Sequence, residues 1–174
     1  QLCFADAQFR FPNAVSLVKK ILDYVMENYC DNKLSLKQIS EALGVHENYI
    51  SNLFKTAYGE NLSSYVEKLR IEKACELILE NQHDLIAVYN GNYDATMHRF
   101  GPESIEALSQ LRANADAFAL FSQLIRRHWQ QHNTLVGFAM DHGCHEIDGD
   151  LGSHGLDMPE DLNIRHRYMA YPAK

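Results

Sequence analysis

Histidines and carboxylates occur in the second half of this sequence at spacings that suit metal binding. Asp94 and His98 lie four residues apart. Asp141 and His142 are adjacent, and His154 follows in a glycine-flanked loop. Carboxylate oxygens and imidazole nitrogens are the ligands of zinc and similar divalent ions. A lone histidine of this kind is more often a surface or capping residue, but three such sites at one sheet edge would favour a divalent metal, zinc or alternatively manganese.

An α/β arrangement would place these residues at one edge. The apolar runs 84–90 and 134–140 predict two buried strands, and the apolar spacing between them predicts helices at 103–111 and 113–132. Strand, helices and strand in this order favour a small parallel sheet. Ligands collect beyond the carboxyl ends of such strands, and the polar stretches begin there.

Three motifs in this half carry a resemblance to a known family. They are Asp94-x-x-x-His98-x-x-Gly101-Pro102, Asp141-His142-Gly143 and Gly152-Ser153-His154-Gly155-Leu156-Asp157. Residues 84–172 resemble the C-terminal part of the alkaline-phosphatase-like superfamily, nearest to its nucleotide pyrophosphatase/phosphodiesterase branch. The resemblance implies one ion held by Asp94, His98 and His154 and a second held by Asp141 and His142. Two such ions stabilise the attacking and leaving oxygens of a phosphoryl displacement.

The chain departs from that family in its first half. The family supplies a further aspartate ligand and a threonine or serine nucleophile from an earlier strand, where this sequence is helical. Thr96 and Ser153 do not occupy the matching position, and we do not favour His145 as a substitute ligand. We therefore expect no catalytic residue here and a phosphoesterase fragment that is inactive alone.

The first half reads as four helices. Apolar residues at three- and four-residue spacing predict helices at 15–28, 36–43, 47–58 and 62–80. Ser35 and Gln38 form a capping-box pattern, and Gly44 and Gly59 are helix stops. Two short helices joined by a tight turn at about residues 35–58 predict a helix-turn-helix, whose second helix can enter a major groove.

Polar residues line the outward face of that second helix. An asparagine can pair with adenine, a serine with either kind of base edge, and a lysine or arginine with phosphate. The side chains of this kind are Asn48, Ser51, Asn52 and Lys55, with Lys37 and Arg70 nearby. The alternative is an ordinary solvated helix face, which these residues alone would favour.

A second resemblance favours DNA contact. Residues 34–59 resemble the first helix-turn-helix of AraC/XylS-type transcription regulators, and residues 65–79 resemble the linker helix of that family. The resemblance implies that Asn48, Ser51 and Asn52 read bases in double-stranded DNA. The second helix-turn-helix of that family is absent after Gln82, so only half of the usual module is expected.

Composition and charge limit the function classes. The chain has 174 residues, 46% hydrophobic and 22% charged, which is typical of a globular protein. A net charge of −7 excludes a broadly basic nucleic-acid coat protein but not one local DNA-binding surface. No apolar run approaches the roughly 20 residues of a membrane span. The four cysteines form no C-x-x-C pair, which favours free thiols in the cytoplasm.

Together these patterns predict an α+β protein made of two unrelated half-modules. Residues 1–14 would be an extension, 15–81 the all-α DNA-binding module, and 84–174 a partial α/β metal-binding segment. The abrupt change near residue 82 indicates a fusion, a rearranged gene or an assembly artefact. We rank a DNA-binding regulator first; the alternatives are a phosphoesterase fragment with a phosphate ester ligand, and a non-enzymatic interaction module or unstable remnant.

Overall fold

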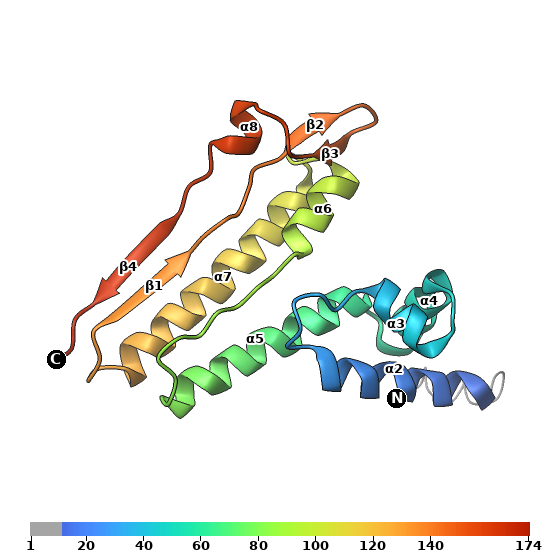
Figure 1. The fold of residues 1–174 in the computed structure, drawn as a ribbon, viewed down its shortest axis with the longest axis horizontal. Coiled ribbons are helices and arrows are strands. Elements are labelled where there is room, and N and C mark those ends of the chain that lie inside the picture. The colour runs from blue at the N-terminus through green and yellow to red at the C-terminus, as the bar shows by residue number, and fades with distance from the viewer. Residues whose placement is uncertain (1–11) are drawn as a thin grey trace. The chain divides into compact units, whose positions relative to one another are not determined.

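A computed structural model describes residues 12–174, which combine helices with short strands (Figure 1). The chain divides into two compact units, residues 1–72 and 73–174, and each is described here by itself. Seven helices and two small antiparallel sheets lie in the described residues, so the α+β prediction is confirmed. The segment predicted as an N-terminal extension lies largely outside the described residues.

Unit 1 contains the helices that the sequence predicts. They are α2 (Pro12–Asn28), α3 (Leu36–Leu43), α4 (Glu47–Tyr58) and the first part of α5 (Leu62–Glu80). The capping box at α3 is confirmed, because the Gln38 backbone N–H donates to Ser35 Oγ and the Ser35 N–H donates to Gln38 Oε1. Gly44 follows α3 with φ of 64°, the left-handed conformation that glycine adopts without strain.

The core of unit 1 comes from the apolar faces of α2, α3 and α4. Its fully buried side chains are Ile21, Val25, Ile39, Ile50 and Phe54. Full burial of each such side chain stabilises the fold by about 1.5–3 kcal/mol. This packing fixes α3 and α4 against each other and leaves the opposite face of α4 to solvent.

Unit 2 differs from the prediction at its beginning. Residues 84–90 form no strand, and α6 (Asn92–Phe100) follows where polar strand-end residues were expected. A strand needs a hydrogen-bonded neighbour, and no strand of the described chain pairs with this segment. Its Ile86 packs instead against the cluster of Ile78, Ile125 and Val136.

The two helices predicted between the strands are one continuous helix, α7 (Ile105–His128). Ser104 caps it, with its side chain accepting a hydrogen bond from the Ala107 N–H at 3.1 Å. The boundary expected near Arg112 carries no helix-breaking residue, so nothing interrupts the helix there. Among residues 12–174, no helix has both the length and the apolar character needed to cross a bilayer.

The strand at 134–140 forms, but its predicted parallel pairing is wrong. β1 (Thr134–Phe138) pairs antiparallel with β4 (Arg167–Tyr171), with Val136 opposite Met169. The parallel partner expected at 84–90 is not a strand, so the C-terminal segment takes that role. The order of predicted elements could not reveal this, since β4 carried no recognised strand signal.

A small hairpin and a short helix complete unit 2. β2 (His145–Ile147) and β3 (Leu151–Ser153) are antiparallel, and Gly149 and Asp150 turn the chain with φ of 84° and 57°. α8 (Pro159–Leu162) follows. α6 packs against both α7 and β3, which brings the hairpin to the side of α6. Among the described residues, Cys30, Cys75 and Cys144 form no disulfide, as predicted, and Cys3 lies outside that part of the chain.

Candidate metal centre

The first pair of predicted ligands shares one face of α6. Asp94 and His98 are one helical turn apart, a spacing that puts both side chains on the same side of the helix. His98 Nε2 lies 3.4 Å from Asp94 Oδ1. The spacing therefore places a carboxylate and an imidazole together, as the sequence predicts.

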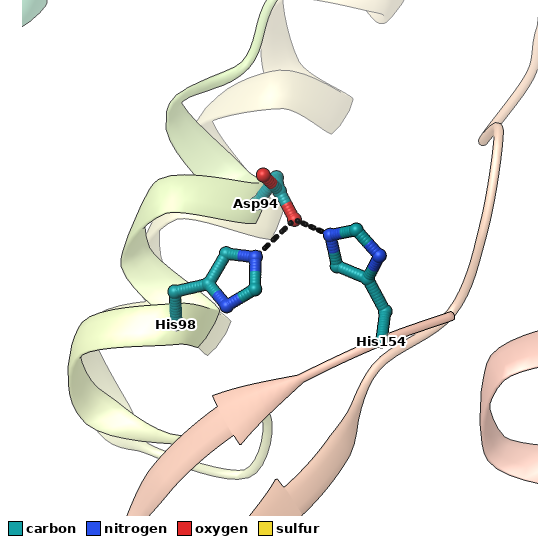
Figure 2. Close-up of side chains that lie close together, drawn as sticks. All are labelled: Asp94, His98 and His154. Atoms are coloured by element: carbon teal, nitrogen blue, oxygen red, sulfur yellow. Dashed lines mark ion pairs between the residues drawn. The ribbon is translucent and has the colours of Figure 1, made fainter. Parts of the chain in front are cut away.

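Two further imidazoles reach the same carboxylate oxygen from loops. His154 directly follows β3, and its Nε2 lies 3.5 Å from Asp94 Oδ1. Figure 2 shows the rings of His98 and His154 both directed at this oxygen. His142 follows β1, and its Nε2 lies 3.9 Å from the same atom. The rings of His142 and His154 stack with centroids 3.7 Å apart.

Backbone carbonyls orient two of these imidazoles. His98 Nδ1 lies 2.8 Å from Gly152 O, and His142 Nδ1 lies 2.9 Å from Gly143 O. A carbonyl oxygen can only accept, so Nδ1 carries the hydrogen in both rings. In a neutral imidazole the lone pair is then on Nε2, the atom that faces Asp94. Protein metal sites commonly fix the histidine tautomer in this way.

The surroundings of Asp94 Oδ1 show whether these residues fit a metal ion. This oxygen is buried and has no hydrogen-bond partner, an uncommon condition for a carboxylate oxygen. With Nδ1–H donating to a carbonyl in His98 and His142, a neutral ring at either position presents an Nε2 lone pair to this oxygen and not a donor. One ligand atom from each of Asp94, His98 and His154 lies within 4.8 Å of the others. One oxygen and two nitrogen donors form a set that suits zinc, so these residues fit a divalent ion.

The remaining predicted ligand, Asp141, lies at the margin of this cluster. Its Oδ2 is 3.7 Å from His142 Nε2, and 77% of its side chain is exposed. Its Oδ1 accepts a hydrogen bond from the His142 N–H. The five predicted residues therefore lie in one region, with three on a common centre and the pair Asp141 and His142 beside it.

Gly152 brings the hairpin against α6. A Cβ atom at this position would collide with the carbonyl oxygen of Met97 and would lie 2.8 Å from Cys144 Sγ. This close approach is what allows Gly152 O to accept from His98. In the sequence this glycine is only a flank of His154, and its contact with His98 arises from the packing of β3 on α6.

His145 has a different role from its neighbour His142. It is buried, and its Nδ1 lies 2.8 Å from Asp161 Oδ1. Burial raises the pKa of the Asp161 carboxyl, but hydrogen bonds from His145 and the Leu156 backbone outweigh it, and the pKa lies below its usual value. No local sequence pattern marks Asp161, because its partner His145 lies sixteen residues away along the chain.

Two neighbouring acidic groups are held in their neutral forms. Burial raises the pKa of the Cys144 thiol, and the charges of Asp94 and Asp161 raise it further. Burial also raises the pKa of Tyr93, with Cys144 contributing. The Cys144 thiol is therefore a poor source of thiolate, and it is not among the three residues that cluster as ligands.

The residues predicted to contact DNA lie in unit 1. Asn48, Asn52 and Lys55 are exposed on α4 and Ser51 is partly exposed. Lys37 is exposed on α3, 4.0 Å from Glu41. Arg70 donates from Nε to Tyr29 O and from Nη2 to Asp31 O, a structural role that the sequence analysis missed. Contact of these six residues with DNA stays a prediction.

Comparison with known proteins bears on both resemblances. A family model described as type I phosphodiesterase / nucleotide pyrophosphatase matches residues 10–169. The match runs through the junction expected near residue 82 and includes the helices of unit 1. Nothing in the comparisons supports an AraC-type module. No curated protein matches the chain, and no solved structure matches it.

Proposed function

Because the chain belongs to the type I phosphodiesterase/nucleotide pyrophosphatase family, we propose that unit 2 supplies the metal-binding part of a divalent-metal-dependent phosphoric ester hydrolase. Asp94, His98 and His154 would hold one ion, and Asp141 and His142 would contribute to a second. The observation that carries the proposal is Asp94 Oδ1, a buried carboxylate oxygen that no donor satisfies and three imidazole Nε2 atoms face.

The ion would polarise a phosphoryl oxygen and lower the pKa of a bound water. The residues of this chain would bind that ion and orient its imidazole ligands. Gly152 O keeps His98 Nε2 directed at the centre, and the negative charge of Asp94 favours a cation there. The hydroxyl of Thr96 donates to the Asn92 carbonyl, so it is engaged by its own helix. Since neither Thr96 nor Ser153 occupies the position of the family's nucleophile, the proposal predicts metal binding by this chain without turnover of a phosphodiester.

Calorimetric titration of the metal-free protein with Zn²⁺ and with Mn²⁺ tests this proposal. We expect one tight metal site per chain, because the ligand atoms of Asp94, His98 and His154 lie close together while the Asp141 side chain is mostly exposed. The double variant His98→Ala/His154→Ala should lose that site. A matched control is His83→Ala/His128→Ala, which removes two exposed histidines of unit 2 away from α6. Wild-type protein that binds neither ion, or a double variant that binds like wild type, rejects the proposal.

A second candidate function is DNA binding by unit 1. One geometric feature favours it: α3 and α4 are joined by a short left-handed turn at Gly44, and α4 exposes Asn48, Asn52 and Lys55. A helix presented in this way can enter a major groove. The net charge of −7 opposes it, since affinity for DNA depends on phosphate neutralisation.

Fluorescence anisotropy with a labelled duplex at low salt tests this candidate. The double variant Asn52→Ala/Lys55→Ala should weaken binding. Lys68→Ala is the control, because it removes an exposed charge of α5 that pairs with Glu60 in the turn between α4 and α5. If Asn52→Ala/Lys55→Ala binds the duplex like wild type, α4 is not the DNA-contacting helix.

A further inference from the structure

Asp161 joins two separate segments of unit 2. Its backbone oxygen accepts from the Gly143 N–H at 2.7 Å, its Oδ1 lies 2.8 Å from His145 Nδ1, and its Oδ2 accepts from the Leu156 N–H at 2.8 Å. Two of these donors lie in the segment 142–145 and the third lies in the loop after β3. Asp161 is only 3% exposed, so water does not compete for its oxygens.

Each of these two segments carries an imidazole of the metal centre. His142 immediately precedes Gly143, and His154 lies two residues before Leu156. Their rings stack, and both Nε2 atoms face Asp94 Oδ1 at 3.9 and 3.5 Å. The position of one segment relative to the other therefore decides whether the two imidazoles reach the same point.

Close backbone packing makes this junction rigid. A Cβ atom at Gly143 would collide with the Glu160 carbonyl oxygen and would lie 3.2 Å from Asp161 Cα. Only a glycine can bring the 142–145 segment so close to the start of α8. The Gly143 N–H then reaches Asp161 O, and His145 reaches the side chain of the same residue from its buried position.

The carboxylate is suited to this role because it accepts at both oxygens. Its ionised state is consistent with a pKa below the usual range. His145 must then donate from Nδ1, since a carboxylate has no hydrogen to give. Removal of the side chain would leave a buried imidazole N–H and a backbone N–H without their acceptor, and both loops would relax.

We infer that Asp161, with His145, is a positioning residue for the metal centre, which holds the two loops in the register that brings His142 and His154 to Asp94. This inference rests on the proposed function, because it assigns Asp161 an effect on metal affinity. It assigns Asp161 no contact with the ion or with a substrate. Residues that orient metal ligands from outside typically change metal affinity by 10- to 100-fold when mutated.

The test compares Zn²⁺ affinity in wild type, Asp161→Ala and Asp161→Asn at a temperature where circular dichroism shows each protein fully folded. We expect Asp161→Ala to weaken binding on the order of 100-fold and Asp161→Asn about tenfold. The asparagine keeps the side-chain volume and one acceptor. We therefore expect the Asp161→Asn protein to fold, and its Zn²⁺ affinity tests the inference even if the Asp161→Ala protein does not fold. Glu160→Gln is the control, since it removes a neighbouring exposed carboxylate of α8.

The visible spectrum of bound Co²⁺ is the readout that a merely structural role would not change. We expect the Asp161 variants to alter its band positions or intensities, because His154 is displaced, and Glu160→Gln to leave it unchanged. Wild-type affinity and spectrum in Asp161→Asn overturn the inference, as does an equal loss in Glu160→Gln. Failure of wild type itself to bind Zn²⁺ or Co²⁺ instead overturns the proposed function and the inference together.

Discussion

Replacement of Asp94 by asparagine should stabilise unit 2 in the absence of metal while it removes metal binding. The carboxylate oxygen Oδ1 is buried without a hydrogen-bond donor, and the neutral tautomers of His98 and His142 that donate from Nδ1 to a carbonyl present an Nε2 lone pair to it. An asparagine has two N–H donors in the same position. It can donate to Nε2 of His98, so the substitution converts an unsatisfied contact into a hydrogen bond.

The magnitude follows from the burial of this side chain. An unsatisfied buried polar group costs about 1–3 kcal/mol. The Asp94 side chain as a whole is 39% exposed, so water partly solvates the carboxylate. We therefore expect Asp94→Asn to raise the free energy of unfolding of the metal-free protein by about 1 kcal/mol, the low end of that range.

Urea unfolding at pH 8, where free imidazole is uncharged, measures this change. The single tryptophan, Trp129, reports on unit 2, because its Nε1 donates to the Ile78 carbonyl and its ring packs with Ile125. Asp116→Asn is the control, an exposed aspartate on α7 whose change should stay within about 0.5 kcal/mol.

Two results would refute this reasoning. Destabilisation of the metal-free protein by Asp94→Asn would mean that the histidines donate hydrogen bonds to the carboxylate, in which case no cation is needed to explain the cluster. Zn²⁺ binding by Asp94→Asn with wild-type affinity would mean that Asp94 is not a ligand. Stabilisation together with loss of Zn²⁺ binding would show that Asp94 serves metal binding at a cost to the stability of the fold.

Three other predictions concern positions that hold the site or the fold. Gly152→Ala should cost about 1–3 kcal/mol by tryptophan fluorescence, because its Cβ collides with a carbonyl oxygen of α6, whereas Gly91→Ala, whose Cβ meets a movable tyrosine ring, should change little. Asp161→Asn should be less stable than wild type at pH 6, and this difference in stability should shrink as the pH falls below about 4. Folding lowers the pKa of the Asp161 carboxyl, so the ionised carboxylate stabilises the folded protein above the unfolded pKa, and this stabilisation is lost when the group is protonated. Equal differences at pH 6 and pH 3 would contradict this. Ser35→Ala should destabilise unit 1 by about 1 kcal/mol in hydrogen exchange of α3, and unchanged exchange would show that the capping box is energetically silent.

The helices of unit 1 could be predicted from sequence because their signals are local. The Ser35 cap, the left-handed Gly44 and the apolar spacing of α4 all act within a few residues. Such signals need no knowledge of the partner element. The sheet of unit 2 could not be predicted in this way, because β1 pairs with β4 across some thirty residues of intervening chain. An apolar run such as 84–90 can become a strand or a packed extended segment, and only the available partner decides which.

The sequence predicts which residues form the candidate site, but the elements that bring them together differ from those predicted. The sequence predicted that strand ends would gather Asp94, His98 and His154, and the three do lie together. They are gathered instead by the helical turn of α6 and by the packing of the β2–β3 hairpin on that helix. The four-residue spacing of the first pair was informative in itself. Asp161 carried no such spacing, since its three partners are up to eighteen residues away in sequence.

The elements that hold the proposed metal ligands are separate from the two-stranded sheet. Asp94 and His98 belong to α6, and His154 is fixed by the hairpin and by the loop that Asp161 holds. None of these elements belongs to the β1–β4 pair, whose register is set by its own ladder. The ligand geometry for the first ion therefore depends on contacts of α6, the hairpin and α8, and the two-stranded sheet influences it chiefly through His142, which follows β1. A centre of this kind can bind its cation through short-range contacts even where the surrounding sheet is small.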